Sequence, residues 1–174
     1  MKAPLLKPQD ILVLLRILTW KQNREWRYSD LASDLEISQS EIFESIKRAK
    51  LSGLFDPLTK KPKRSALKEF ILHGLKYAFP AKLGENTVGI PTAHSADPLF
   101  KLIISNQNDR YVWAQIGGPE KGIAVSPLYR SVPKAVKNCP ELHAYLALID
   151  ALRIGKARER EIAKAELEKR ISSE

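Results

Sequence analysis

The sequence contains few of the residues that form disulfides or bind metal ions. Cys139 is the only cysteine among 174 residues, and three histidines are present. A lone cysteine excludes an intramolecular disulfide and is typical of a reducing compartment. Cys139 and His143 lie four positions apart, but a zinc site needs further ligands. We therefore predict no metal site and no cofactor.

Long hydrophobic runs are also missing near the start of the chain. The run from Ile11 to Leu15 is interrupted by Arg16, whereas a transmembrane helix needs about 20 apolar residues. No secretory signal pattern opens the sequence. These features predict a cytoplasmic protein that has no membrane partner.

Common catalytic motifs are absent as well. The sequence lacks G-x-x-x-x-G-K, G-x-S-x-G and H-E-x-x-H. Gly117-Gly118-Pro119 is typical of a turn rather than of a phosphate-binding loop. His73 and His94 have no obvious catalytic partner in the sequence. We predict no catalytic residues, and we do not expect an enzyme.

Positive charge, in contrast, is plentiful. Lys and Arg number 29 against 20 Asp and Glu, which gives a formal net charge of +9. Residues 1–64 carry 13 basic and 8 acidic residues, residues 65–138 carry 9 and 5, and residues 139–174 carry 7 and 7. An excess that is confined to the first two parts suits a polyanionic partner such as nucleic acid.

The first helix is expected from Pro8 to about Trp20, because proline suits the first helical position and Asp10 favours the positive end of the helix dipole. Residues 11–18 are apolar nearly all round, which a helix with one solvent-exposed face does not need. The second face of this helix must be covered, either by the C-terminal helices or by another subunit.

Two shorter helices are expected next, over residues 30–35 and from Ser38 to about Lys50. Ser38 and Glu41 have the spacing of a capping box. In this motif the serine hydroxyl accepts a hydrogen bond from the Glu41 amide, and the glutamate carboxylate accepts one from the Ser38 amide. Prolines 57 and 62 then predict a turn or a short hairpin over residues 54–63.

The remaining sequence predicts an irregular lobe between helices. A fourth helix is expected over residues 65–79, and helix returns from Pro140 onward. Short apolar runs that are candidate strands occupy residues 102–104, 111–113 and 122–125. The predicted fold class is α+β, mainly α with minor β. We expect a winged helix-turn-helix module in residues 1–79, an irregular α/β lobe in 80–138 and C-terminal helices in 139–174.

Two helices joined by a tight turn and followed by a basic, turn-prone segment have the order of a winged helix-turn-helix. Residues 28–49, YSDLASDLEISQSEIFESIKRA, resemble the helix-turn-helix of winged-helix bacterial regulators of the broad MarR-like type. In that pattern a small residue, here Ala32, packs inside the first helix. Glu36 stands where many relatives have glycine, so a different turn conformation is expected. The resemblance covers about 50 residues, and it implies DNA binding.

Helical geometry then indicates which side chains would face DNA. Ile42, Ile46 and Ala49 fall on one face and are expected in the core. Gln39 and Ser40, near the start of the helix, are candidates for reading base edges. The complete predicted DNA-binding set is Gln39, Ser40, Phe43, Glu44, Lys47, Arg48, Lys50, Lys60, Lys61, Lys63 and Arg64.

Members of this set have different expected roles. Lys47, Arg48 and Lys50 are expected to meet phosphates. Glu44 would accept a hydrogen bond from a cytosine amino group, although it also repels the DNA backbone. The four cations of residues 60–64 would contact phosphate or the minor groove from a hairpin, the wing. A solvated loop is the plainer interpretation of such a cation cluster.

These features lead to a sequence-specific transcriptional regulator that binds double-stranded DNA, as a homodimer on a palindromic site. A competing hypothesis is an antitoxin-like protein that holds a second protein through residues 80–174, with DNA binding secondary. A protein-binding winged helix and an effector site in the lobe around Trp113 are two further hypotheses. The charged segment 156–171 is either an ordinary exposed helix, with Glu166 and Arg170 as an i,i+4 pair, or an oligomerisation arm.

Overall fold

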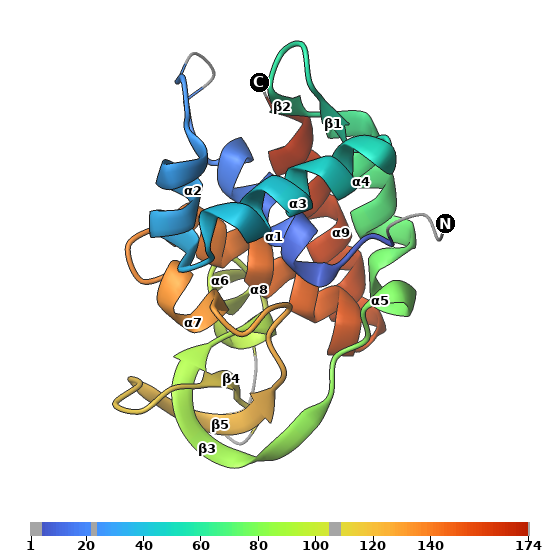
Figure 1. Ribbon diagram of the computed structural model, residues 1–174. Coiled ribbons are helices and arrows are strands. Elements are labelled where there is room, and N and C mark those ends of the chain that lie inside the picture. Colours follow the sequence, from blue (N-terminus) through green and yellow to red (C-terminus); the bar gives the residue numbers. More distant parts are fainter. Residues whose placement is uncertain (1–4, 22–23, 105–108, 174) are drawn as a thin grey trace.

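The N-terminal part of the chain folds into three helices and a short hairpin (Figure 1). A computed structural model describes residues 5–21, 24–104 and 109–173. The first elements are α1 (Pro8–Leu18), α2 (Tyr28–Leu35), α3 (Gln39–Leu51), β1 (Phe55–Asp56) and β2 (Lys61–Pro62). Strands β1 and β2 pair antiparallel. The two short helices and the hairpin that the sequence predicts between residues 30 and 63 are therefore present.

Shorter elements and two long helices make up the rest. They are α4 (Arg64–His73), α5 (Leu75–Ala78), β3 (Leu83–Pro91), the 3₁₀ turn η1 (Ala93–Ser95), α6 (Leu99–Leu102), β4 (Tyr111–Ala114), β5 (Glu120–Val125), α7 (Val132–Ala135), α8 (Pro140–Ile154) and α9 (Ala157–Ser172). The predicted class, mainly α with minor β, is confirmed. The irregular lobe with a little sheet corresponds to the region around β3, β4 and β5.

Two local predictions in this part were wrong, and one strand was not predicted. The helix expected over residues 65–79 is divided at Gly74, a residue with low helix propensity that ends α4. Residues 102–104 are not a strand, because α6 has begun just after Pro98 and ends at Leu102. Strand β3 was missed, since most of its residues are exposed and the sequence LGENTVGIP carries no regular apolar alternation.

The small sheet closes on itself. Strand β3 runs antiparallel to both β4 and β5, and β4 pairs parallel with β5. Gly89 of β3 lies opposite Ala114, and a Cβ at this position would overlap the carbonyl oxygen of Trp113. Glycine is therefore required for the close approach of β3 and β4.

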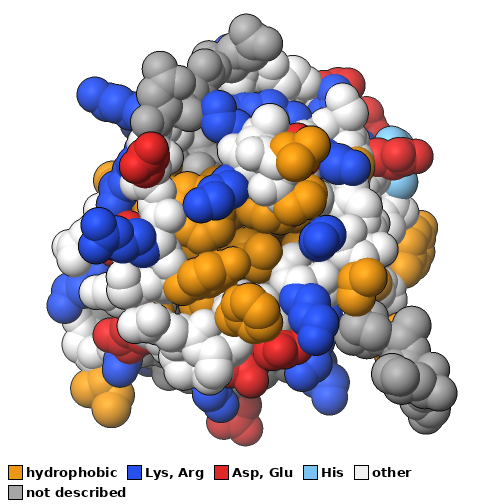
Figure 2. Space-filling view, turned by 45° about the horizontal axis from the view of Figure 1, so that its top comes forward, with side chains coloured by type: hydrophobic (Ala, Val, Ile, Leu, Met, Phe, Trp, Pro, Cys, Tyr) orange, Lys and Arg blue, Asp and Glu red, His pale blue; other side chains and the backbone are white. Residues whose placement is uncertain are grey.

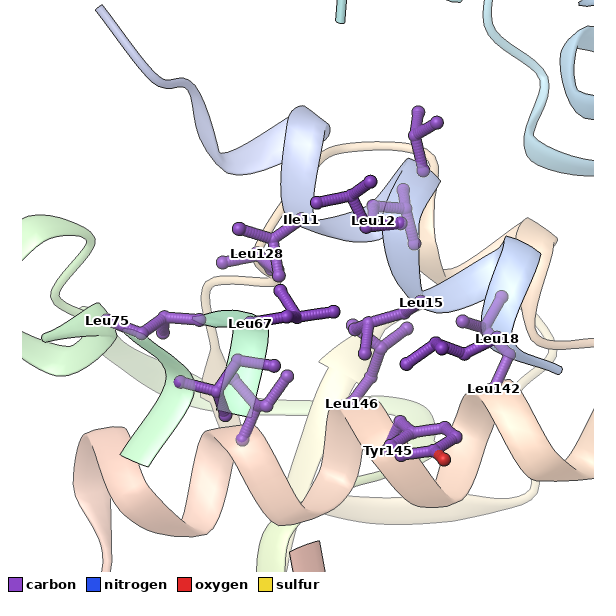
Figure 3. Close-up of a cluster of buried hydrophobic side chains, with 14 of the residues drawn as sticks. Ile11, Leu12, Leu15, Leu18, Leu67, Leu75, Leu128, Leu142, Tyr145 and Leu146 are labelled. Carbon is purple, nitrogen blue, oxygen red and sulfur yellow. The ribbon is translucent and has the colours of Figure 1, made fainter. Parts of the chain in front are cut away.

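The apolar helix α1 is enclosed by other parts of the same chain. Figure 3 shows its side chains, among them Leu12 and Leu15, in one cluster with Leu67 of α4 and Leu146 of α8. All four of these leucines are buried, and each fully buried leucine contributes about 1.5–3 kcal/mol to folding. The second face of α1 is therefore covered by the C-terminal helix α8 of the same chain, which was one of the two possibilities left open by the sequence.

Helix α9 also packs inside its own chain. Its apolar anchors Leu167 and Ile171 are completely buried, and the Tyr145 hydroxyl of α8 donates to the carbonyl of Arg170. The predicted Glu166–Arg170 ion pair is present at 3.8 Å. Because these anchors are used internally, they offer no apolar surface to a second subunit.

A buried polar network attaches the sheet to α8. The Asp150 carboxylate accepts hydrogen bonds from the Thr92 hydroxyl at 2.6 Å, the Trp113 indole at 2.7 Å and Arg153 at 2.8 Å. Burial raises the pKa of Asp150 above its ordinary value, although the Arg153 charge opposes this shift. Trp113 is only 1% exposed, so its indole is part of the core and offers no surface to an effector.

Candidate nucleic-acid interface

The turn between α2 and α3 has the conformation that glycine favours. Glu36 adopts φ 52° and ψ 46°, in the left-handed region, which costs a residue with a side chain roughly 1–2 kcal/mol. The Ile37 amide donates to the carbonyl of Ala32 at 3.1 Å. The expectation of a different turn was therefore wrong, because Glu36 itself takes up the strained conformation.

Helix α2 begins slightly earlier than expected. Its first residue is Tyr28 instead of residue 30, and its N-cap is Arg27. The Asp30 carboxylate accepts a hydrogen bond from the Arg27 amide at 2.8 Å, so an acidic side chain in the first turn completes the cap. This start places the Tyr28 ring directly beside α3.

Only one of the two hydrogen bonds of the predicted capping box is present at the start of α3. The Ser38 hydroxyl accepts from the Glu41 amide at 3.3 Å, as expected. The Glu41 carboxylate, however, accepts from the Gln9 side-chain amide at 2.7 Å instead of from the Ser38 amide. Since Gln9 belongs to α1, this contact fixes the first turn of α3 to the central helix.

The middle of α3 is anchored to α1 by a buried ion pair. Arg48 is 6% exposed, and its guanidinium donates to both carboxylate oxygens of Asp10, at 2.8 and 2.9 Å. This hydrogen-bonded carboxylate raises the pKa of Arg48. The prediction that Arg48 meets phosphate was wrong, because its charge is already neutralised beneath the helix. Arg48 positions α3.

The outward side of α3 agrees better with expectation. Ile42, Ile46 and Ala49 are buried, as predicted. Most of the predicted contact residues on α3 are exposed, and Glu44 is half-buried. The exposed members are Gln39, Ser40, Phe43, Lys47 and Lys50.

The hairpin after α3 presents cations to solvent. The Asp56 carboxylate accepts from the Leu58 amide at 3.0 Å and from the Thr59 hydroxyl at 2.8 Å. These hydrogen bonds lower the pKa of Asp56, and the one from the Leu58 amide has the largest effect. They also hold the turn in place. The turn is followed by three exposed lysines, Lys60, Lys61 and Lys63.

Arg64 is the exception among the predicted hairpin cations. It is half-buried, and its Nη1 donates to the carbonyls of Ile171 at 2.9 Å and Ser173 at 3.1 Å. The side chain thus donates hydrogen bonds to carbonyls at the C-terminal end of α9, where the helix itself supplies no donors. Its guanidinium is only in part available to a ligand.

A broad basic groove lies between the segment that leads into α2 and the hairpin. Its volume is about 1420 Å³, and its lining includes residues 24–27 and 58–65. Seven basic residues line it against two acidic residues, Glu25 and Asp30. The basic set is Lys21, Arg24, Arg27, Lys60, Lys61, Lys63 and Arg64.

Next to this groove, aromatic rings form a continuous cluster that reaches from the buried Phe55 to the surface. The Trp26 ring lies 5.8 Å from Tyr28 and 6.3 Å from Phe55, and Tyr28 lies 5.8 Å from Phe43, measured between ring centroids. The Trp26 indole donates to the carbonyl of Lys60 at 3.1 Å. Figure 2 shows this face, with hydrophobic side chains gathered at its centre and Lys and Arg around them.

The cluster encloses an aromatic pocket between α3 and the hairpin. Its volume is about 290 Å³. Phe43 is 52% exposed and Tyr28 38% exposed. The full lining is Trp26, Tyr28, Phe43, Ile46, Lys47, Lys50, Phe55, Pro57 and Lys60.

Sequence reasoning missed much of this interface. The predicted DNA-binding set includes no residue between Trp20 and Tyr28, yet this segment contributes Trp26 to the pocket and three cations to the groove. The available signal was local: Trp20, Trp26 and Tyr28 alternate with Lys21, Arg24 and Arg27. Basic residues interleaved with aromatic residues are typical of nucleic-acid surfaces.

Two further observations bear on different kinds of function. Within residues 5–21, 24–104 and 109–173, no three His, Cys, Asp or Glu side chains are grouped as metal ligands. None of the helices described there combines the length and hydrophobicity needed to cross a bilayer.

In comparisons with known proteins, no family model, no curated protein and no solved structure matched the chain significantly.

Proposed function

We propose that this chain is a transcriptional regulator that binds double-stranded DNA through α3 and the hairpin. One observation carries the proposal: the exposed Lys47 and Lys50 of α3 line the same pocket as Lys60 of the hairpin. A helix that enters the major groove beside a basic hairpin is the arrangement with which winged helices bind DNA. The MarR-like pattern of residues 28–49 supports the same interpretation.

Each group of side chains has a role in the proposed complex. Gln39 and Ser40 lie in the first turn of α3 and read base edges in the major groove. Lys47 and Lys50 lie further along the exposed side and contact phosphates. Lys60 and Lys61 extend the contact to the neighbouring backbone from the hairpin.

The rigid attachment of α3 supports this role. Side chains that read base edges need a fixed position, since a shift of the helix changes every hydrogen bond at once. The Glu41–Gln9 contact holds one end of α3, and the Arg48–Asp10 pair holds its second half. The proposed reading face is therefore presented on a rigid element.

The experiment that tests this function begins with selection of a preferred site from random DNA duplexes. Affinity for the selected duplex is then measured for the wild type and for a Ser40→Ala/Lys47→Ala variant. We expect the variant to bind at least about tenfold more weakly, since it loses a base contact and a phosphate contact. Failure to select any site, or unchanged affinity, would contradict the proposal.

A matched control separates local contacts from net charge. Lys121 in β5 and Lys137 after α7 are both exposed, and neither lies on α3 or the hairpin. A Lys121→Ala/Lys137→Ala variant removes two positive charges from the chain. Its affinity for the selected duplex should stay close to that of the wild type.

A second candidate function is binding of a partner protein through residues 80–174, as an antitoxin does. Exposed apolar side chains in the lobe favour it, above all Ile104 and Ile116. Single exposed apolar residues are ordinary on monomers, so this candidate ranks second. Co-purification with the product of a neighbouring gene, lost in Ile116→Asp, would support it.

The proposal includes a homodimer on a palindromic site, because two copies would place two α3 helices one helical turn apart on DNA. The contact between the copies must lie outside the buried anchors of α9. Sedimentation of the protein with and without the selected duplex tests this part. A single copy on each duplex would restrict the proposal to a monomeric binder.

A further inference from the structure

The aromatic pocket is unusual for a surface that only reads paired bases. We propose that it binds one unpaired nucleobase of a DNA strand, whose phosphates lie on the surrounding lysines and in the basic groove. This inference rests on the proposed function and deepens it, because it assigns a preferred form of DNA. The preferred ligand is duplex DNA with an unpaired or extruded base next to the segment that α3 contacts.

The exposed rings are the first reason for this assignment. Phe43 and Tyr28 are each more than one-third exposed, and their rings lie 5.8 Å apart beside Trp26. Within a duplex each base offers only its edges, since its faces are covered by stacking. An unpaired base exposes a face, and stacking on aromatic side chains is how proteins bind such bases.

The size of the pocket fits a single base. Pockets for small molecules range from roughly 300 to 1,000 Å³, and this pocket of about 290 Å³ is just below the smallest of them. A ligand with one planar ring system fits that volume, whereas the side chains of a long peptide segment need a longer groove.

The charges around the pocket point to an anionic ligand. Lys47, Lys50 and Lys60 line it, and the described lining contains no acidic residue. A purely apolar protein partner would leave these three ammonium groups without counterions. A nucleotide, in contrast, places phosphates on both sides of its base, within reach of flexible lysine side chains.

The pocket is also continuous with the basic groove. Trp26 and Lys60 line both of them, so a strand whose base enters the pocket can continue directly across the cations of the groove. The hydrogen bond from the Trp26 indole to the Lys60 carbonyl fixes this junction. A single DNA strand can therefore stack one base in the pocket and place its phosphates on the cations of the groove.

The test compares two DNA ligands: a short duplex, and the same duplex with one extra unpaired thymidine. Anisotropy titrations at constant salt should show about tenfold tighter binding of the second ligand to the wild type, a typical effect of one base–aromatic stack. A Tyr28→Ala/Phe43→Ala variant should lose this preference and bind the two ligands with equal affinity. Both residues are exposed, so the variant is expected to fold, which circular dichroism verifies.

Two matched variants complete the design. Tyr28→Phe/Phe43→Tyr keeps both rings and should keep the preference. Tyr77→Ala/Phe100→Ala removes two exposed aromatic rings elsewhere on the molecule and should leave it unchanged. As an independent readout, oligothymidylate should quench tryptophan emission in the wild type, and most of this quenching should disappear in Trp26→Phe.

The outcomes separate this inference from the proposed function. Equal affinity for the two duplexes overturns the unpaired-base pocket and leaves duplex binding intact. Binding of oligothymidylate without binding of the paired duplex supports the pocket and overturns the proposed function. No binding of any DNA overturns both, and makes a protein the better candidate for this surface.

Discussion

Two tryptophans on opposite sides of the molecule have opposite tasks. Trp113 in the lobe is enclosed, and its indole donates to the buried Asp150 carboxylate. Trp26 beside α3 is half-buried, its indole donates to the Lys60 carbonyl, and its ring lines a surface pocket. Both indole N–H groups are satisfied. Trp113 therefore serves packing in the lobe, whereas Trp26 stays at the surface beside α2 and α3.

Buried ion pairs show a related difference. Asp10 and Arg48 join α1 to α3 directly beneath the exposed side of α3. Asp150 and Arg153 lie on one helix, and their network holds the sheet against it. The first pair therefore positions the surface that we propose binds DNA, whereas the second stabilises the lobe. This contrast can be tested separately at each site.

The largest effect is expected from Arg48→Met. The substitution leaves the Asp10 carboxylate buried without its partner, which costs about 3–5 kcal/mol of unfolding free energy. Urea denaturation measures the loss. Adding Asp10→Asn to the same chain should recover part of it, because the uncompensated charge is then gone. A loss below about 1 kcal/mol would show that the pair does not anchor α3.

A somewhat smaller loss is expected from Asp150→Leu. The change removes the acceptor of the Trp113 indole and of the Thr92 hydroxyl, whereas Arg153 keeps two backbone carbonyls as acceptors. It also removes a carboxylate whose pKa is raised by burial. We expect a loss of about 2–3 kcal/mol. DNA affinity of the folded variant should equal that of the wild type. A selective loss of DNA binding would contradict the separation of the two regions.

Glu36→Gly should stabilise the helix-turn-helix. Glycine adopts the left-handed conformation without strain, which stabilises the folded state, but its greater backbone freedom also stabilises the unfolded chain. The net increase in unfolding free energy is therefore about 0.5 kcal/mol. Thermal unfolding detects it as a small rise in Tm. Glu36→Ala keeps the strain and serves as the control. Both variants also lose the exposed ion pair between Glu36 and Lys134, so equal stability of the two variants would show that backbone strain at this position does not matter.

The smallest effect concerns pH and the hairpin turn. The pKa of Asp56 is lowered below its ordinary value of 3.8, chiefly by the Leu58 amide. Its contribution to stability is therefore complete above pH 3.8 and is lost as the pH falls through the lowered pKa. NMR titration of the Leu58 amide should show a midpoint below 3.8. A midpoint at or above that value would mean that the turn does not depend on this carboxylate.

The sequence predicted the elements whose signals are local. The spacing of Ile42, Ile46 and Ala49 predicted the buried side of α3, and Pro57 and Pro62 predicted the hairpin. The continuous apolar character of α1 predicted that both of its faces are covered. Each of these inferences needed only helix geometry or turn chemistry.

Partners that are distant in sequence could not be predicted in the same way. Arg48 looked like a phosphate ligand because nothing near it in the sequence identifies Asp10, 38 positions away, as its partner. Glu41 similarly bonds to Gln9 across 32 positions. The aromatic pocket combines three separate segments, around Trp26, Phe43 and Phe55. Only the tertiary arrangement brings them together.

The central claim is that the face carrying α3 and the hairpin binds DNA. The salt dependence of the DNA-binding constant tests it most directly. The logarithm of the binding constant for the selected duplex is plotted against the logarithm of the salt concentration. Lys47→Ala and Lys60→Ala should each reduce the steepness of this line by about 1, and Lys121→Ala should leave it unchanged. Equal slopes for all four proteins, or an equal reduction in Lys121→Ala, would contradict the claim.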